Sequence, residues 1–223
     1  AFRDPTGIKP LIIGKRQAPN GVEWAAASES VALDLLGFET VKDLANGESF
    51  LVRPGEEPEF FQLREEPHRP CIFELVYFAR PDSMLDGVSV YKTRRRFGEA
   101  LAKQWIETDG PQAEVVIPIP DSSRDAALSM ANFMGLPYRE GFIKNRYIGR
   151  TFIMPDQETR TTSIRRKLNP IPLEFEGKDV LLVDDSIVRG TTSVKIVEMV
   201  RSAGAAEVHM RIASPPTTNS CFY

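Results

Sequence analysis

The segment VLLVDDSIVRGTTS, residues 180–193, is the strongest constraint on how this chain can fold. Its four leading apolar residues predict a strand that is buried on both faces, because a half-exposed strand alternates apolar and polar side chains. Asp184 and Asp185 follow directly, and Gly190 opens a turn of small hydroxylated residues before a helix that we expect to begin near Ser193. A strand, a polar turn and a helix in this order predict one unit of a parallel sheet.

The same alternation continues on both sides of this segment. We expect two more strands and three helices, over residues 114–120, 207–214, 91–105, 124–135 and 193–204. In the helix over 91–105, Phe97, Leu101 and Trp105 recur at a spacing of four and are expected to face the core. The basic run TRRRF, residues 93–97, is interpreted as the exposed face of that helix. Open α/β sheets bind ligands at the carboxyl ends of their strands, which is where Asp184 and Asp185 are expected.

The first 66 residues have a different pattern. Short strands are expected at 11–15, 23–28, 48–53 and 59–63, around a helix within 28–37. The polar, proline-bounded segment REEPHRP, residues 64–70, is taken as a domain boundary, which gives domains 1–66 and 67–223. The apolar run after it, residues 71–79, is interpreted as a strand or a buried segment.

Composition excludes several classes of function. A net charge of -3 and a pI of about 5.6 do not suggest a bulk attraction to nucleic acid or to an anionic membrane. No apolar run approaches the roughly 20 residues of a membrane helix, and the first residues lack the pattern of a signal peptide. The two cysteines cannot form a disulfide framework, so we expect a cytoplasmic protein. The two histidines have no metal-ligating neighbours in sequence, so histidine-based catalysis is not expected.

The residues of the segment 180–193 suggest a ligand with both hydroxyl and anionic groups. Adjacent carboxylates repel each other unless a cation or hydroxyl donors satisfy them. Gly190 with the hydroxyls of Thr191, Thr192 and Ser193, at the positive end of a helix dipole, predicts a phosphate cradle. Together they predict a site for a sugar phosphate. The alternative is a strand that ends in an acidic turn capping a helix.

The run VLLVDDSIVRGTT resembles the signature of type I phosphoribosyltransferases, which use 5-phosphoribosyl-1-pyrophosphate (PRPP). The resemblance implies that Asp184 and Asp185 hold the ribose hydroxyls and organise Mg²⁺. It also implies that the loop from Ser186 to Ser193, with Arg189, wraps the 5-phosphate. The expected fold is a mostly parallel sheet flanked by helices.

Other segments resemble the glutamine PRPP amidotransferase family: CIFELVYFARPDS, VVIPIPDSSRDAAL, KNRYIGRTFIMP and IRRKLNP, with RDPTGIKPL near the start. The resemblance covers essentially the whole chain. It implies that the phosphoribosyltransferase domain is preceded by the C-terminal part of an α+β, N-terminal-nucleophile glutaminase domain. The implied reaction transfers glutamine-derived ammonia to PRPP. Asp121, Ser122 and Ser123 would form the pyrophosphate loop, with Ser122 at the metal, and Lys144, Tyr147 and Arg150 would belong to a basic lid.

The lid and the turn at 121–123 also have plainer interpretations. Taken alone, a basic loop with a tyrosine can bind nucleic acid but is more typical of a solvated surface. A small polar turn can simply cap a helix through Ser123. Two other functions remain open for the whole chain. One is a type I transferase with a purine or pyrimidine base as acceptor, and the other is a regulatory module that senses PRPP without turnover.

The resemblance carries further expectations. Both ends of the chain look cut, so it is interpreted as an internal piece of a longer protein. Residue 1 is alanine rather than a cysteine nucleophile, so the chain is not expected to hydrolyse glutamine. Cys71 and Cys221 match two ligands of a [4Fe–4S] cluster found in one branch of the family; such a cluster needs four thiolates, so this chain is expected to hold two free thiols. Feedback inhibition by purine nucleotides and a homotetramer are also implied.

Overall fold

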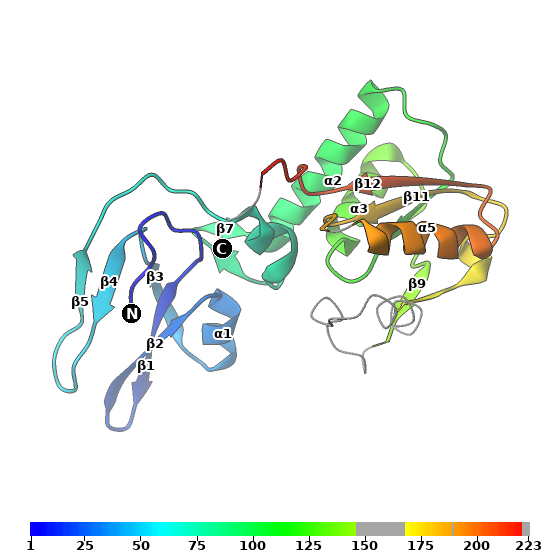
Figure 1. Ribbon diagram of the computed structural model, residues 1–223. Helices are drawn as coiled ribbons and strands as arrows, with labels where there is room; N and C mark the ends of the chain where they lie inside the picture. The colour runs from blue at the N-terminus through cyan, green and yellow to red at the C-terminus, as the bar shows by residue number, and fades with distance from the viewer. Residues whose placement is uncertain (146–167, 189, 220–223) are drawn as a thin grey trace. The chain divides into compact units, whose positions relative to one another are not determined.

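The computed structural model describes residues 1–145, 168–188 and 190–219. The chain divides into two compact units, Ala1–Thr93 and Arg94–Tyr223, here called the N-terminal and the C-terminal unit (Figure 1). None of the helices in the described part of the chain is long and apolar enough to cross a membrane.

The N-terminal unit is built from short antiparallel strands. Its largest sheet has the order β2-β1-β3, and two further pairs are β4-β5 and β6-β7. These strands are β1 Ile12–Ala18, β2 Gly21–Ala27, β3 Glu39–Asp43, β4 Glu48–Leu51, β5 Glu59–Gln62, β6 Met84–Leu85 and β7 Val88–Ser89. The only regular α-helix described wholly within this unit is α1, Ser30–Leu35. Four of these strands and the helix lie where the sequence predicted them, whereas β3, β6 and β7 were not predicted.

Residues 67–93, assigned to the second domain from the composition break, pack within the N-terminal unit. The buried Arg3 guanidinium donates to both carboxylate oxygens of Asp86, at 2.5 and 2.8 Å. The Glu29 carboxylate accepts from the Ser83 hydroxyl at 2.8 Å. A shared apolar cluster adds to these contacts and comprises Ile12, Leu33, Ala79, Leu85 and Val90. The proline-bounded break at 64–70 therefore does not coincide with the division between the compact units.

The apolar run over 71–79 forms a π-helical segment, Glu74–Phe78, instead of a strand. Val76 is buried, whereas Ile72 and Phe78 are exposed. A short apolar run bounded by prolines fits a strand and a buried helix equally well, so the sequence pattern alone could not decide between them.

The C-terminal unit is centred on a parallel sheet of order β12-β11-β8. Its strands are β8 Val115–Pro118, β11 Asp179–Asp184 and β12 Glu207–Ile212. The helices are α2 Val90–Glu107, which begins in the last residues of the N-terminal unit, α3 Arg124–Met134 and α5 Thr191–Ser202. The predicted alternation of parallel strands and helices is confirmed for each of these elements.

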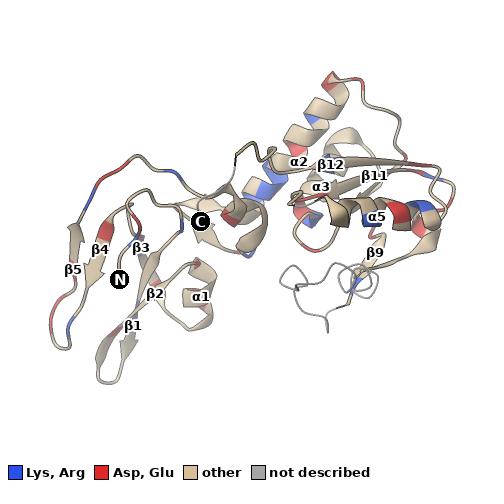
Figure 2. Cartoon of the chain, viewed as in Figure 1, with Lys and Arg blue, Asp and Glu red and all other residues tan. Residues whose placement is uncertain are grey.

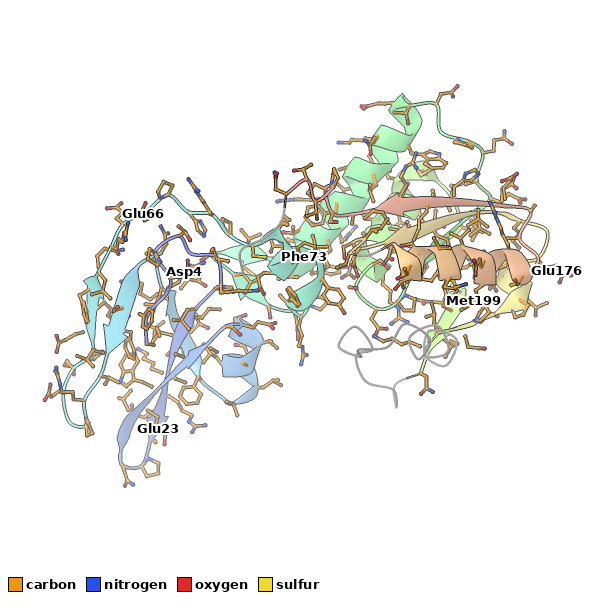
Figure 3. The ribbon with its side chains drawn as sticks, in the orientation of Figure 1. Asp4, Glu23, Glu66, Phe73, Glu176 and Met199 are labelled. Carbon is orange, nitrogen blue, oxygen red and sulfur yellow. The ribbon has the colours of Figure 1, made fainter. Side chains whose placement is uncertain are left out.

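Helices cover both faces of this sheet. Val180 and Leu182 of β11 contact a cluster with Ile196 and Met199 of α5; Met199 is labelled in Figure 3. The alternate β11 residues, Leu181 and Val183, contact the opposite cluster. That cluster also holds side chains from α2 and α3: Leu101, Ala102, Trp105, Ala126, Ala127, Met130 and Ala131. Two buried faces explain why β11 is apolar at four successive positions.

A small antiparallel pair flanks the main sheet. It joins β9, Phe142–Lys144, to β10, Leu168–Pro170, and a 3-10 turn, Pro172–Glu174, follows. The rings of Phe142 and Phe175 lie 5.1 Å apart in the core, and neither side chain is exposed. This packing fixes the direction of β9, whose last residue is Lys144.

Candidate functional site

The two predicted binding turns lie at the same edge of the main sheet. Because β8 and β11 are parallel, with Val183 opposite Pro118, their carboxyl ends meet there. The Ile119 N–H still donates to the Val183 carbonyl at 2.9 Å, immediately before the turn at 121–123. The Ser122 hydroxyl then donates to the Asp185 carboxylate. Segments that are 63 residues apart in the sequence thus form one site.

The acidic pair is buried. Asp184 is 9% exposed and Asp185 is 7% exposed. Burial and then the neighbouring charge of Asp185 raise the pKa of Asp184 to about 7, although the Asp185 N–H donates to its carboxylate at 2.8 Å. Burial also raises the pKa of Asp185, and this effect is opposed first by hydrogen bonds from Ser122 and Ser186. The Ser186 hydroxyl lies 2.5 Å from the Asp185 carboxylate.

The start of α5 has the geometry of an anion cradle. Gly190 is in the left-handed region, with φ of 69°, where a residue with a side chain would be strained. The helix begins at Thr191, and no described side chain caps its first turn. The free N–H groups of such a turn, with the helix dipole, attract phosphate. Thr191 is exposed, and Thr192 and Ser193 are partly buried beside it.

The turn before α3 is held by ion pairs rather than by a serine cap. The Asp121 carboxylate lies 2.6 Å from the Lys144 ammonium and 3.3 Å from the Arg124 guanidinium. The Ser123 hydroxyl donates to the Ile119 carbonyl, so its side chain does not cap the helix, and the interpretation of this turn as a simple serine cap is not supported. Arg124 also pairs with Glu140 at 3.2 Å.

The structure therefore brings together six of the fourteen site residues singled out in the sequence: Asp121, Ser122, Lys144, Asp184, Asp185 and Ser186. Tyr147, Arg150 and Arg189 lie outside the described residues, as does most of the predicted lid. Sequence reasoning missed Arg124, whose place directly after the turn was the available signal. It also missed Arg94, which was taken as part of an exposed face although it is buried.

One of the two cysteines lies among the described residues. Cys71 is a free, partly buried cysteine of the N-terminal unit, and Cys221 lies outside the described residues.

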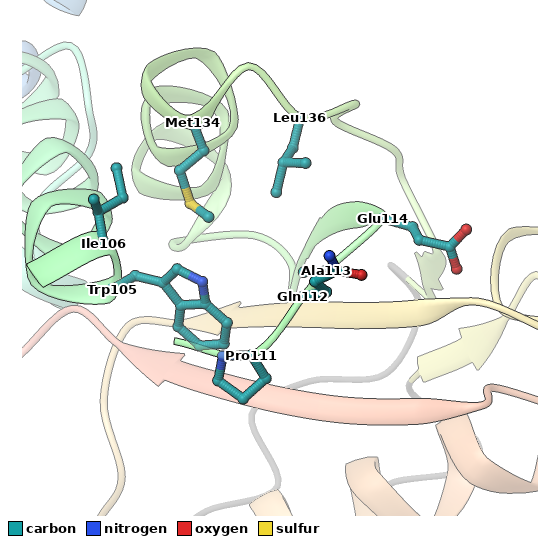
Figure 4. A pocket seen from close by; sticks show the side chains of 8 residues that line it. All are labelled: Trp105, Ile106, Pro111, Gln112, Ala113, Glu114, Met134 and Leu136. Carbon is teal, nitrogen blue, oxygen red and sulfur yellow. The ribbon is translucent and has the colours of Figure 1, made fainter. Parts of the chain in front are cut away.

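A cavity among the described residues of the C-terminal unit lies elsewhere. It has a volume of about 330 Å³ and is lined by Trp105 and Ile106 of α2, Met134, Leu136 and the segment 111–114 (Figure 4). The segment 111–114 precedes β8, so this cavity is at the amino end of the strand, opposite to the acidic pair. Ligands of open α/β sheets bind at the carboxyl ends, so we place the functional site at the acidic pair and not in this cavity.

Comparison with known proteins shows the family to which the chain belongs. A family model described as phosphoribosyl transferase domain matches residues 93–213, more than half of the chain. The chain is 56% identical over 218 residues to an amidophosphoribosyltransferase of Pseudomonas aeruginosa, 53% to one of Escherichia coli and 52% to one of Saccharomyces cerevisiae. In each case the match covers 96% of this chain and 43% of the relative. The chain thus spans less than half the length of these curated relatives.

Solved structures show a similarity to the same family of enzymes. A structure of glutamine PRPP amidotransferase from B. subtilis, complexed with ADP and GMP, is 42% identical and superposes with a TM-score of 0.83. That match covers 99% of this chain and 47% of the other. A second structure, described as the allosteric regulatory enzyme of purine biosynthesis, has a TM-score of 0.84 at the same identity.

The chain belongs to the phosphoribosyltransferase family, and its C-terminal unit carries that domain. Within the family, the relatives reported above are amidophosphoribosyltransferases from bacteria and yeast. The resemblance to glutamine PRPP amidotransferases and the expected parallel-sheet fold are therefore confirmed.

Proposed function

We propose that this chain is the PRPP-binding part of an amidophosphoribosyltransferase, an enzyme that transfers glutamine-derived ammonia to PRPP. The products would be 5-phosphoribosylamine, pyrophosphate and glutamate. One observation supports this most directly: a buried acidic pair lies beside the uncapped, glycine-led start of a helix, at the carboxyl edge of a parallel sheet. Hydroxyl-binding and phosphate-binding groups are thus next to each other, as a phosphorylated pentose requires.

Each part of PRPP has a proposed partner. Asp184 and Asp185 would accept hydrogen bonds from the ribose hydroxyls. The 5-phosphate would lie against the start of α5, held by N–H groups and by the hydroxyls of Ser186, Thr191, Thr192 and Ser193. The pyrophosphate would lie at the turn of Asp121, Ser122 and Ser123, close to the Lys144 ammonium. Tyr147, Arg150 and Arg189 are proposed to complete the site from the segments outside the described residues.

The donor set fits Mg²⁺. Asp184, Asp185 and the Ser122 hydroxyl supply hard oxygen ligands, and the raised pKa of Asp184 reflects a buried negative charge that a cation would relieve. Among the described residues, no group of three or more His, Cys, Asp or Glu side chains could hold a metal ion. Mg²⁺ ordinarily binds through one or two carboxylates, waters and substrate phosphates rather than an all-protein cage, so two carboxylates are sufficient.

The chain's own residues would act mainly by positioning and by charge. When pyrophosphate leaves C1 of the sugar, the ring gains oxocarbenium character, and the leaving group gains negative charge. The Lys144 ammonium would stabilise that charge, and bound Mg²⁺ would supply further Lewis-acid stabilisation. The acidic pair would hold the sugar in the geometry for attack. Ammonia needs no strong general base, in agreement with only two histidines in the chain.

Several finer expectations remain proposals. The structure of the B. subtilis relative is described as a complex with ADP and GMP, so we propose that purine nucleotides also bind this chain as inhibitors. A homotetramer and a cytoplasmic location are predictions from the resemblance, as is a [4Fe–4S] cluster in the intact parent protein, in which Cys71 and Cys221 would supply two of the four thiolates. The alternatives of a base-accepting transferase and of a PRPP-sensing module differ from this proposal in their acceptor or in their lack of turnover.

Calorimetry and an activity assay test the proposal. PRPP is titrated into the chain with and without Mg²⁺, and pyrophosphate release is then measured with ammonia as acceptor. We expect Mg²⁺-dependent binding, and pyrophosphate release that requires ammonia. Binding without release would favour the sensing module, and release that requires a purine or pyrimidine base would favour the base-accepting transferase.

The double variant Asp184→Asn, Asp185→Asn should lose Mg²⁺-dependent binding. The matched control is Asp179→Asn, which makes the same substitution at the amino end of the same strand. Circular dichroism verifies that each variant is folded. PRPP affinity that is unchanged in the folded double variant would contradict the assignment of the site.

A further inference from the structure

Two residues of one segment, Glu140 and Lys144, contact the turn at 121–123 and the helix start that follows it. Glu140 lies 3.2 Å from Arg124, the first residue of α3, and Lys144, the last residue of β9, lies 2.6 Å from Asp121. Asp121 and Arg124 are themselves 3.3 Å apart. Figure 2 colours the basic residues at the start of α3 and at the end of β9 blue. Opposite charges therefore alternate along a row of four side chains, here called the charge clamp: Lys144, Asp121, Arg124 and Glu140.

The backbone on both sides of Glu140 is fixed to the sheet and to the core. Before it, Tyr138 forms a parallel bridge with Val116 of β8. After it, Gly141 is buried, and a Cβ atom built there would lie 2.6 Å from the Cζ atom of the Phe175 ring. Backbone packed so closely against a core side chain has little freedom to move. The Glu140 carboxylate therefore extends from a rigid support toward the start of α3.

The Glu140 carboxylate is oriented by Tyr138 and faces Arg124. The Tyr138 hydroxyl donates to Oε1 of Glu140 at 2.7 Å, and Nε of Arg124 lies 3.2 Å from the same oxygen. Burial and then this hydrogen bond raise the pKa of the Tyr138 phenol, so it remains a donor at neutral pH. Nε of Arg124 is buried and makes no hydrogen bond among the described residues. The ion pair with Glu140 therefore compensates the burial of this part of the guanidinium.

The charge clamp holds the turn at 121–123 by groups that are separate from the metal site. The Ser122 hydroxyl also anchors the turn, by donating to the Asp185 carboxylate. Both partners of that contact are proposed ligands of Mg²⁺, so metal binding would change it. Glu140 is not among the proposed ligands, and its contact with Arg124 can persist when metal and substrate bind.

The Asp121 carboxylate competes with pyrophosphate for the Lys144 ammonium. Its Oδ2 atom lies 2.6 Å from Nζ of Lys144, and its Oδ1 atom lies 3.3 Å from the Arg124 guanidinium. Because Arg124 shares the negative charge of Asp121, part of the Lys144 charge is left for an incoming anion. This sharing requires that the guanidinium stays beside Asp121, and Glu140 holds it there from the opposite side.

We propose that Glu140 is a positioning residue for the pyrophosphate group: it holds Arg124 against Asp121 and thereby keeps Lys144 available to the leaving group. Tyr138 supports this role by orienting the Glu140 carboxylate. The inference rests on the proposed function, because it concerns how the same site binds the pyrophosphate part of PRPP. Glu140 touches neither substrate nor metal in this proposal.

The variant Glu140→Met tests this role, because charge alone and positioning predict opposite results. Removing a carboxylate near an anion site should strengthen anion binding through charge alone, whereas loss of positioning should weaken it. In calorimetry with Mg²⁺ we expect inorganic pyrophosphate to bind about fivefold more weakly, since half-exposed ion pairs have modest effects. The affinity for ribose 5-phosphate should be unchanged. The matched control Glu207→Met, at the exposed amino end of β12, should bind both ligands as the unaltered chain does.

Two further variants separate orientation from charge and identify the partner. Tyr138→Phe removes only a hydroxyl and should weaken pyrophosphate binding by about two- to threefold. In an Arg124→Met background, Glu140→Met should have far less effect than it has alone. Pyrophosphate binding that is unchanged or tighter in Glu140→Met, or equal losses in both backgrounds, would overturn the inference. So would an equal loss of ribose 5-phosphate affinity, because a general loss of structure affects both ligands.

A crystal structure of the Glu140→Met variant provides a readout that requires no ligand. We expect the Arg124 guanidinium to move away from Asp121; a contact retained at 3.3 Å would overturn the inference. Circular dichroism verifies folding, and failure of both Glu140→Met and Tyr138→Phe to fold would assign these residues a purely structural role and also overturn it. If the unaltered chain bound neither pyrophosphate nor ribose 5-phosphate, the proposed function would fail, while the crystallographic result would still decide the role of Glu140.

Discussion

Replacing Asp184 by asparagine should stabilise the metal-free protein, and more so at alkaline than at acidic pH. The Asp184 carboxyl is buried and lies next to Asp185, so folding disfavours its charged form. Asparagine has nearly the same shape and carries no charge. Its side-chain oxygen can still accept the hydrogen bond from the Asp185 N–H, which is 2.8 Å long with aspartate.

The size of the effect follows from the pKa difference between the two states. In the folded protein the pKa of Asp184 is about 7, against 3.8 for an ordinary aspartate. At about 1.4 kcal/mol per pKa unit, this corresponds to about 4 kcal/mol of lost stability above pH 7. Because the folded pKa is the higher one, the unfolded chain loses its proton first. Stability therefore falls as the pH rises from about 4 to about 7 and is constant above that range.

At pH 5 less than half of this penalty has developed, so the stabilising effect of Asp184→Asn should be about 3 kcal/mol larger at pH 8 than at pH 5. Burying the amide N–H₂ group of asparagine costs about 1 kcal/mol at either pH and does not alter this difference. The net gain at pH 8 should be about 3 kcal/mol, a large fraction of the stability of an ordinary domain.

Urea unfolding followed by tryptophan fluorescence can measure this difference for the C-terminal unit alone, which contains Asp184. The chain has two tryptophans, Trp24 in the N-terminal unit and Trp105 in the C-terminal unit. In a Trp24→Phe background, the buried Trp105 alone reports on the unit that contains Asp184. The experiment uses EDTA at pH 5 and at pH 8, with Asp179→Asn as the control at the amino end of the same strand.

An equal effect of Asp184→Asn at both pH values, or a destabilisation at pH 8, would refute the reasoning. Adding Mg²⁺ at pH 8 should stabilise the unaltered protein, because a bound cation favours the ionised carboxylate. The same addition should have much less effect on the Asp184→Asn variant. Equal Mg²⁺ stabilisation of both proteins would place the ion elsewhere.

Three further predictions concern packing and buried charge. Gly98→Ala should destabilise the C-terminal unit by about 1–3 kcal/mol in thermal unfolding, because its Cβ would lie 2.0 Å from the Ala126 oxygen. Leu182→Ala, in the fully buried centre of β11, should cost about 2–5 kcal/mol, and a cost under about 1 kcal/mol would mean that this strand is not enclosed on both faces. Arg3→Met should cost about 3 kcal/mol, read from Trp24, because it leaves Asp86 and buried carbonyls without their donor.

The central sheet was predictable from the sequence because its signals are local. Burial on both faces makes β11 apolar at every position from Val180 to Val183, and that run is visible without any tertiary information. The parallel arrangement then required that the turns after β8 and β11 meet at one edge. The contact between Ser122 and Asp185 follows from this rule, although the two residues are far apart in the chain.

The N-terminal unit was less predictable because its elements are short and their partners are distant. The β3 strand, Glu39–Asp43, is mostly exposed and carries charged residues at three of its five positions, so it has little hydrophobic periodicity. Its place in the sheet depends on pairing with β1. Residues 67–93 were assigned to the second domain because of a proline-bounded break, but a break in composition does not reveal ion pairs such as that of Arg3 with Asp86.

The burial of Arg94 was indicated by the spacing of residues on α2, but the sequence does not show which element packs against that face. Positions 94, 98, 101 and 105 share one face of α2, and Leu101 and Trp105 on that face were recognised as core residues. The same periodicity places Arg94 on the buried side, and Gly98 indicates a close approach by another backbone. Composition argued for exposure, because arginine is rarely buried. Periodicity was the better guide, because Arg94 shares its face of α2 with Gly98, Leu101 and Trp105, and it is buried as they are.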